Sequence, residues 1–186
     1  GARVEWAAGK EEREKSGENQ TSCNAATSNA VLDSPLSSPQ LTQSLMALMR
    51  HFKTGRRLHY RYTMQILDRV RQHYTARPNC LRIEVPHDVR VHVLGSLHGQ
   101  LGDLFTVLTQ RKHPGPKNWF VFTGNFIGES ALGVETVLAA CVLKLFYPRF
   151  VHLLRGGNET RQASESVLHF DQVALSKYDQ RSEGWP

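Results

Sequence analysis

Three short β-rich runs, each followed by a glycine-containing polar loop, constrain the fold of this chain more than any other feature. Two longer segments between them, residues 101–109 and 134–146, repeat apolar side chains at helical spacing. Strands that alternate with helices predict strand-helix-strand units and a parallel sheet. We therefore expect an α/β fold with a β-α-β-α-β core, whose loops meet at the carboxyl ends of the strands, where open α/β sheets bind ligands. The runs cover residues 91–94, 119–122 and 150–154, and their loops begin at Gly95, Gly124 and Gly156.

The first 80 residues divide into two segments of different composition. Residues 1–40 are rich in Gly, Ser, Asn, Gln, Glu and Lys and have few periodic apolar side chains, so we interpret them as a disordered tail. Residues 41–80 carry apolar side chains at the spacing of two helix faces, with Gly55 between the helices and Pro78 after the second. The sequence thus predicts an N-terminal helical pair at 41–80, in front of an α/β domain at 81–186.

The positive charge of the chain is local. The net charge is +6, and residues 41–80 hold eight Arg or Lys side chains against the single acidic residue Asp68. A basic helical segment can dock an acidic partner, a membrane surface or nucleic acid, although a solvated helix face is the commoner explanation. Because the sequence has no aromatic-rich RNA motif and no zinc finger, we expect no specific nucleic-acid partner.

The cysteines and the hydropathy pattern indicate the compartment. Cys23, Cys80 and Cys141 are widely spaced and form no C-x-x-C pair, which argues against a disulfide scaffold or a zinc site. The longest apolar runs, such as residues 137–143, fall far short of the roughly 20 residues that span a bilayer. The first residues have no apolar secretory core. We expect an intracellular protein, cytoplasmic or nuclear, without a transmembrane segment.

The three loops resemble the motifs of a known enzyme family. They read Gly-Ser-Leu-His-Gly, Gly-Asn-Phe-Ile-Gly-Glu-Ser and Gly-Gly-Asn-Glu in chain order. The metal-dependent serine/threonine phosphoprotein phosphatases carry G-D-x-H-G, G-D-x-V-D-R-G and G-N-H-E at these places. The flanking stretches 58–67, 97–104 and 147–156 look like the branch that includes the tetratricopeptide-linked and EF-hand-linked phosphatases. This resemblance covers about residues 45–180 and implies the first half of a calcineurin-like metallophosphoesterase fold, with its partial α/β domain at 81–186.

Most positions that the resemblance assigns to chemistry are replaced in the first two loops. His98 is retained as a metal ligand, whereas Ser96 stands in place of the neighbouring Asp ligand. In the second loop the bridging Asp is Asn125, a weak ligand, and the Asp that supports the catalytic His is Gly128. The phosphate-binding Arg is Glu129, which would repel a phosphate rather than bind it. Two divalent metals need anionic oxygen ligands that these side chains do not supply.

The third loop shows the same loss. The Asn ligand of the family is Gly157, and the His that serves as general acid is Asn158. A general acid contributes about 10² to 10⁴ to the rate, so its replacement alone removes most of the expected activity. Arg155 and Glu159 match positions that we interpret as mainly structural.

These replacements favour a phosphatase-like protein without activity, a pseudophosphatase. We expect no metal cofactor, and an active form would require two divalent ions, Mn, Fe or Zn. The alternative is a residual phosphoesterase that recruits Asp103, Glu129 or Asn158 as ligands. A third possibility is a chain that does not fold stably, because half of such a domain exposes apolar faces. The resemblance implies a phosphoprotein or a regulatory protein as partner.

Overall fold

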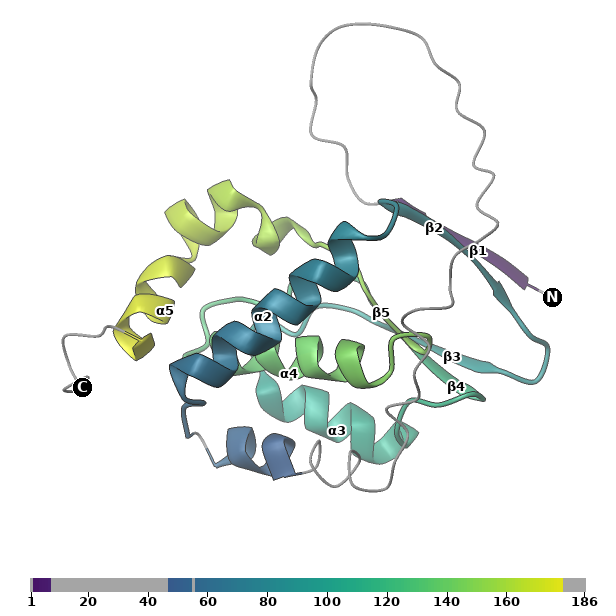
Figure 1. The fold of residues 1–186 in the computed structure, drawn as a ribbon, viewed down its shortest axis with the longest axis horizontal. Coiled ribbons are helices and arrows are strands. Elements are labelled where there is room, and N and C mark those ends of the chain that lie inside the picture. Colours follow the sequence, from purple (N-terminus) through teal and green to yellow (C-terminus); the bar gives the residue numbers. More distant parts are fainter. Residues whose placement is uncertain (1, 8–46, 55, 179–186) are drawn as a thin grey trace, which may run out of the picture.

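The computed structural model describes residues 2–7, 47–54 and 56–178, and its elements are shown in Figure 1. The described residues contain five strands, four α-helices with both ends described, and a helical stretch at 47–53. The strands are β1 (Ala2–Ala7), β2 (Cys80–Val85), β3 (Arg90–Leu94), β4 (Asn118–Phe122) and β5 (Val151–Leu153), and the helices are α2 (Tyr60–Thr75), α3 (Leu101–Arg111), α4 (Gly133–Phe146) and α5 (Phe170–Tyr178). A 3-10 turn (Gly157–Glu159) and a π-helical turn (Ala163–Val167) connect β5 to α5.

The central sheet is parallel and has the order β3-β4-β5. Leu94 of β3 lies beside Phe122 of β4, which in turn lies beside Leu153 of β5. The three strands therefore end at the same edge, and α3 and α4 provide the two crossovers between them. The predicted β-α-β-α-β core is confirmed.

One hydrophobic core joins the sheet to its helices. Phe120 and Phe122 of β4 are no more than 1% exposed and pack among apolar side chains of α3 and α4. The sequence predicts one broad apolar face on α4, but that helix is buried nearly all round, including the polar residues Glu135 and Lys144. The reason is that α2 and α5 also pack against α4, on sides that the sheet and α3 leave open.

The N-terminal helical pair is confirmed for the part of it that the structure describes. Phe52, in the stretch 47–53, is fully buried, and Thr63 and His73 face inward from α2, which crosses α4 (Figure 1). Residues 41–46 of the first predicted helix and Gly55 of the turn lie outside the described residues.

The pairing of β1 with β2 differs from the sequence interpretation of residues 1–40. Ala2–Ala7 form strand β1, which pairs antiparallel with β2 from Ala2 beside Val85 to Ala7 beside Cys80. The tail interpretation at 1–40 is wrong for this segment, and residues 8–40 lie outside the described part. Residues 3–6 alternate charged and apolar types, Arg-Val-Glu-Trp, which is a strand pattern, but a strand this short depends on its ladder, and its partner among the described strands lies more than 70 residues away.

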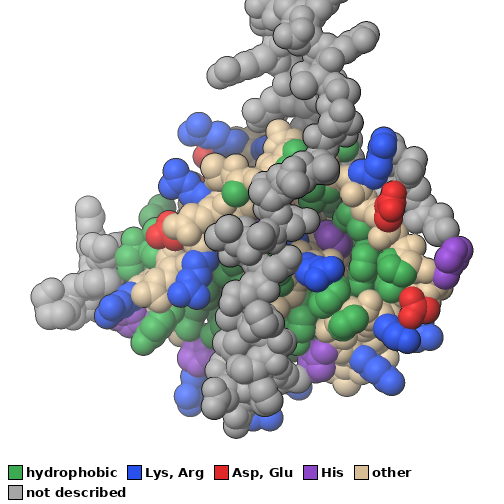
Figure 2. Space-filling view, turned by 45° about the vertical axis from the view of Figure 1, so that its right-hand side comes forward, with side chains coloured by type: hydrophobic (Ala, Val, Ile, Leu, Met, Phe, Trp, Pro, Cys, Tyr) green, Lys and Arg blue, Asp and Glu red, His purple; other side chains and the backbone are tan. Residues whose placement is uncertain are grey.

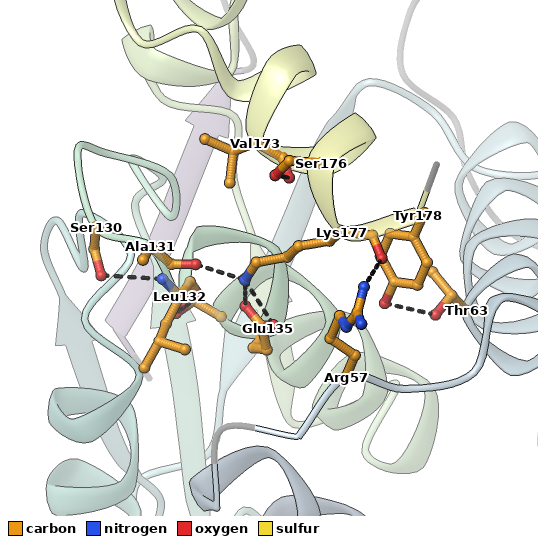
Figure 3. A network of polar contacts seen from close by, with 11 residues as sticks. Arg57, Thr63, Ser130, Ala131, Leu132, Glu135, Val173, Ser176, Lys177 and Tyr178 are labelled. Carbon is orange, nitrogen blue, oxygen red and sulfur yellow. Dashed lines mark hydrogen bonds and ion pairs between the residues drawn. The ribbon is translucent and has the colours of Figure 1, made fainter. Parts of the chain in front are cut away.

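Helix α5 closes the described chain and is fastened by polar contacts that Figure 3 shows. The Lys177 ammonium binds the carboxylate of Glu135 on α4, with 2.7 Å to Oε1, and also the carbonyl oxygen of Ala131. Arg57 donates to the Lys177 carbonyl oxygen at 2.7 Å, and the hydroxyls of Tyr178 and Thr63 are 3.1 Å apart. These contacts, which we call the α5 latch, join α5 to α4, to α2 and to the connection before α2.

The surface carries scattered positive charge. Figure 2 shows Lys and Arg side chains around the rim of one face, with hydrophobic side chains between them. Among the described helices, none combines the length and the apolarity that a membrane span requires.

Candidate functional site

The loops after β3, β4 and β5 meet at the carboxyl edge of the sheet, as the sequence predicts. Backbone hydrogen bonds join the first loop to the second: the amides of Leu97 and His98 donate to the Asn125 carbonyl oxygen at 3.0 and 2.9 Å. The amide of Gly99 donates to the Phe126 carbonyl oxygen at 2.7 Å. The two loops therefore form one surface whose shape is set by the backbone.

Glu159 joins the third loop to the second. One carboxylate oxygen accepts from the amides of Asn125 at 2.7 Å and Gly156 at 2.9 Å, and the other accepts from Phe126 at 2.7 Å and Ile127 at 3.2 Å. Hydrogen bonds to a charged acceptor are stronger than neutral ones. Glu159 thus has a structural part in the loop cluster, in agreement with its interpretation from the sequence.

The polar side chains of the three loops contact one another at the centre of the cluster. The Asn125 side-chain nitrogen donates to the Ser96 hydroxyl at 3.1 Å, and its oxygen accepts from the Asn158 backbone amide at 3.0 Å. The Asn158 side-chain nitrogen donates to the Ile127 carbonyl oxygen at 2.8 Å and lies 3.3 Å from Nδ1 of His98. Four of the predicted site residues are therefore brought together, and they satisfy one another.

The backbone of the site adopts conformations that are uncommon for its side chains. His98 has φ of 47° and Asn125 has φ of 55°, both in the left-handed region, where non-glycine residues occur rarely and at a cost. Such conformations persist where the surroundings determine them, and here the backbone bonds between the loops do so. The backbone hydrogen bonds between the loops thus fix a loop conformation that the side chains of His98 and Asn125 alone would not favour.

Gly128 lies too close to the first loop to carry a side chain. A Cβ atom at this position would be 2.7 Å from the His98 carbonyl oxygen, which is backbone and cannot swing away. The aspartate that the family resemblance assigns here would therefore require the second loop to move. A Cβ atom at Gly157, by contrast, would meet nothing within 4 Å.

The donor atoms at this cluster do not fit a pair of divalent metals. Around His98 they comprise one imidazole, the Ser96 hydroxyl and the amides of Asn125 and Asn158, while the one nearby carboxylate, that of Glu159, is occupied by backbone amides. Within residues 2–7, 47–54 and 56–178, no three His, Cys, Asp or Glu side chains gather as a metal site would require. Hard cations bind mainly anionic oxygen, so this donor set is unsuited to them.

The remaining predicted residues take no part in these contacts. The side chains of Glu129 and Asp103 are exposed, and no hydrogen bond described here links either one to the cluster. The sequence did not indicate the part of the Ile127 carbonyl oxygen as acceptor for Asn158. A backbone acceptor leaves no trace in residue types, so only the loop conformation reveals it.

Comparison with known proteins places the fold and the loops in a class. No family model matches the chain. A solved protein serine/threonine phosphatase from Saccharomyces cerevisiae, described as similar to human phosphatase PP5, superposes with a TM-score of 0.66 and 25% identity over 75% of this chain and 45% of its own. The three loops at the edge of the parallel sheet and this match define a calcineurin-like metallophosphoesterase fold, of which the chain carries a part.

Curated relatives give the family. The chain is 35% identical over 124 residues to mouse serine/threonine-protein phosphatase with EF-hands 2, which covers 67% of the chain and 16% of that protein. It is 31% identical over 134 residues to serine/threonine-protein phosphatase 5 of Arabidopsis thaliana, covering 72% of the chain and 25% of the relative. The chain belongs to the serine/threonine phosphoprotein phosphatase family, and it spans a quarter or less of the length of these two relatives.

Glu159→Gln is expected to lower the free energy of unfolding by about 1.5 to 3 kcal/mol, because a neutral amide holds the same four backbone amides less well and can accept at only one of its two ends. Urea denaturation measures the effect. Glu129→Gln makes the same chemical change at an exposed position of the second loop and is expected to cost less than about 0.5 kcal/mol. Equal losses in the two variants would contradict the structural part assigned to Glu159.

Proposed function

We propose that this chain is a catalytically inactive serine/threonine phosphatase-like protein whose three loops form a closed polar surface instead of a metal centre. The observation that carries the proposal is the position of Asn158. Its side-chain amide donates to the Ile127 carbonyl oxygen and faces Nδ1 of His98, the one ligand retained from the family motif in this part of the chain. An amide at this position has no titrating proton to give to a leaving group.

The electrostatics of the loops also support inactivity. The family motif has an Arg where this chain has the exposed Glu129, and a carboxylate does not attract a phosphate group. Two dications need a negative charge between them, and the Asn125 side chain at this position is neutral and already makes two hydrogen bonds within the protein. Metal binding is thus weakened at Asn125, and phosphate binding is weakened at a different residue, Glu129.

A residual phosphoesterase with other ligands is not favoured. It would need His98 to gather at least two further anionic ligands, and the nearest candidates by sequence, Asp103 and Glu129, are exposed and outside the cluster of contacts. We further propose that the protein acts by binding, with a phosphoprotein or a regulatory protein as partner, because the family acts on phosphoproteins.

Metal content and hydrolysis together test the proposal. After incubation with excess Mn²⁺ and gel filtration, the protein is expected to hold far less than one metal per chain by mass spectrometry of the elements. It is expected to hydrolyse p-nitrophenyl phosphate no faster than its His98→Ala variant. Stoichiometric metal, or a rate that His98→Ala abolishes, would overturn the proposal.

The double variant Ser96→Asp, Asn125→Asp provides the positive control. It returns two carboxylates beside His98, at positions that now face one another at 3.1 Å, and is expected to raise Mn²⁺ affinity by at least about tenfold. The matched control Asp103→Asn, Glu129→Gln removes two exposed carboxylates and is expected to leave metal content unchanged. A fall in metal content in this control would favour the residual phosphoesterase.

A further inference from the structure

Helix α2 carries an unusual share of the exposed apolar surface. Of the eight large hydrophobic residues that are exposed in the described chain, five belong to this helix. They are Tyr60, Tyr62, Met64, Leu67 and Tyr74. A helix that packs on a core by one face normally presents polar residues on the other, so this distribution calls for a physical explanation.

Most of the packing of α2 on the protein is made by another face of the helix. The inner face of the helix is formed by Thr63 and His73, which are 5% and 6% exposed, together with the partly buried Ile66 and Val70. This face, at positions three and four apart, contacts α4. Met64, Leu67 and Tyr74 each follow a residue of this inner face by one position, so they form a second stripe on the flank of the helix beside that face, and Tyr62 lies outside the stripe.

The second stripe has the spacing of a coiled-coil seam. Tyr60, Met64, Leu67, Arg71 and Tyr74 follow one another at intervals of four, three, four and three residues. This alternation keeps side chains along one line of a helix and is the pattern by which a partner helix is recognised. We call these five residues the α2 stripe.

The ends of the α2 stripe are held by the protein, while its centre is open. The Tyr60 ring meets the Tyr178 ring at 6.4 Å, and the Tyr74 hydroxyl donates to the Leu153 carbonyl oxygen at 3.5 Å. Met64 and Leu67, between them, are 37% and 38% exposed. The stripe thus has a tyrosine held in place near each end and two aliphatic side chains at its centre. Tyrosine and methionine are enriched in protein interfaces, where tyrosine often contributes much of the binding energy.

The charge beside the stripe is positive. Arg61 and Arg69 are exposed on α2 outside the stripe and Arg71 is exposed within it, against the single exposed carboxylate Asp68 of this helix, and no ion pair between described residues involves any of the three arginines. A partner helix with Glu or Asp beside its apolar seam would pair with these groups as e and g residues do in coiled coils. A basic partner would be repelled, so the charge selects an acidic one.

From this spacing, exposure and charge we infer that the flank of α2 that carries the α2 stripe is a docking surface for an acidic amphipathic helix of another protein. Nucleic acid fits less well, because the accessible centre of the stripe is aliphatic and offers no ring on which a base could stack. The surface lies on a helix apart from the three loops, so its use does not depend on whether the loops bind metal.

The test uses the full chain and a designed probe peptide. The probe is a fluorescently labelled helix of four heptads with Leu at a and d and Glu at e and g. Fluorescence anisotropy at about 0.1 M salt is expected to give saturable binding. The double variant Met64→Glu, Leu67→Glu is expected to weaken binding at least about tenfold, because it places charge at the centre of the stripe. Absence of saturable binding to the wild-type chain would overturn the inference.

A matched control separates helix docking from general attraction. The double variant Gln65→Glu, Gln72→Glu introduces the same two charges on α2, at exposed positions outside the stripe, and is expected to change the affinity by less than about threefold. Equal weakening in both double variants would overturn the inference, because it would mean that charge alone attracts the probe. Circular dichroism checks that both variants keep the wild-type helix content. If Met64→Glu, Leu67→Glu unfolds, Met64→Gln with Leu67→Gln replaces it, with the same expected order of affinities.

Discussion

Replacing Lys177 with methionine is expected to lower the free energy of unfolding by about 3 to 5 kcal/mol, because it leaves the Glu135 carboxylate buried without its partner. The Glu135 side chain is only 3% exposed, that of Lys177 is 17% exposed, and their closest atoms are 2.5 Å apart. Methionine retains the length and apolar volume of the lysine stem, so the loss reports on charge rather than on packing. Urea denaturation followed by circular dichroism measures it.

The exposed pair between Arg161 and Glu165 is the matched control for Lys177. Its atoms are 3.0 Å apart, but the two side chains are 87% and 49% exposed, and such surface pairs contribute less than about 1 kcal/mol. Arg161→Met is therefore expected to have a small effect. The double variant Lys177→Met, Glu135→Met removes both charges and is expected to recover most of the loss. A loss from Lys177→Met no larger than that from Arg161→Met would show that the α5 latch does not stabilise the fold.

The regular core was predictable because its signals are local. The segments that became β3, β4 and β5 are short and apolar, and each ends at a glycine, while α3 repeats Leu101, Leu104 and Leu108 on one face. Helix α2 was found in the same way, and Pro78 follows its end. Local spacing of apolar residues indicates such elements, so they can be found from a single sequence without an alignment.

The α5 latch could not be predicted, because it depends on residues distant in sequence. Glu135 appeared within an apolar helix and Lys177 within a polar segment, at a sequence separation of 42. Their pairing follows from the angle at which α5 returns over α4, which no local pattern encodes. The pairing of β1 with β2 was missed for the same reason.

The loop cluster was predictable in its residues but not in its contacts. Ser96, His98, Asn125 and Asn158 were identified from the family motifs, and the structure brings their side chains into contact. The close approach of Gly128 to the His98 backbone follows from dihedral angles rather than from residue types. Because of this close approach, an aspartate at position 128 would require the loop backbone to move as well as the side chain to change.

The free energy of unfolding is expected to fall steeply as the pH decreases from 6.5 to 4. Burial lowers the pKa of His73 and of His152 from 6.5 to about 4, with a smaller contribution from the nearby Lys144 ammonium. Nε2 of His73 and both ring nitrogens of His152 are buried and make no close hydrogen bond among the described atoms, and only the Arg149 backbone offers the charged His152 ring a small compensation. The unfolded chain takes up these protons first, and stability present above pH 6.5 is lost through the folded pKa near 4.

The two histidines are together expected to contribute about 3 to 5 kcal/mol to this loss, since one pKa unit corresponds to about 1.4 kcal/mol and solvent screening reduces the contribution of His73. Urea denaturation at intervals from pH 7 to pH 4 measures the slope. His152→Phe removes one titrating ring from the apolar face beside Trp119 and is expected to reduce the loss by about half. If neither His152→Phe nor His73→Phe changed the slope of stability against pH, the acid loss of stability could not be assigned to these two histidines.

Lys144 extends the same dependence to higher pH. Burial, with a smaller contribution from Arg77, lowers the pKa of this lysine from 10.5 to about 7, although its ammonium donates to the Pro148 and Val151 carbonyl oxygens at 2.9 and 2.7 Å. Because the folded chain releases this proton before the unfolded chain does, stability is expected to rise from pH 7 to pH 9. Above that range the raised pKa of Cys141, about 11, opposes the rise, since the unfolded thiol ionises first.

Lys144→Met is the variant that tests this upper limb. It is expected to flatten the rise between pH 7 and pH 9 while leaving the greater part of the acid limb, since burial rather than Lys144 is the main cause of the two low histidine pKa values. A rise that persists in Lys144→Met would assign it to another group. Fluorescence-detected urea titrations at half-unit pH steps resolve the two limbs. We expect them to place the maximum of stability in mildly alkaline solution, because the buried basic groups between α2, α4 and β5 are neutral there.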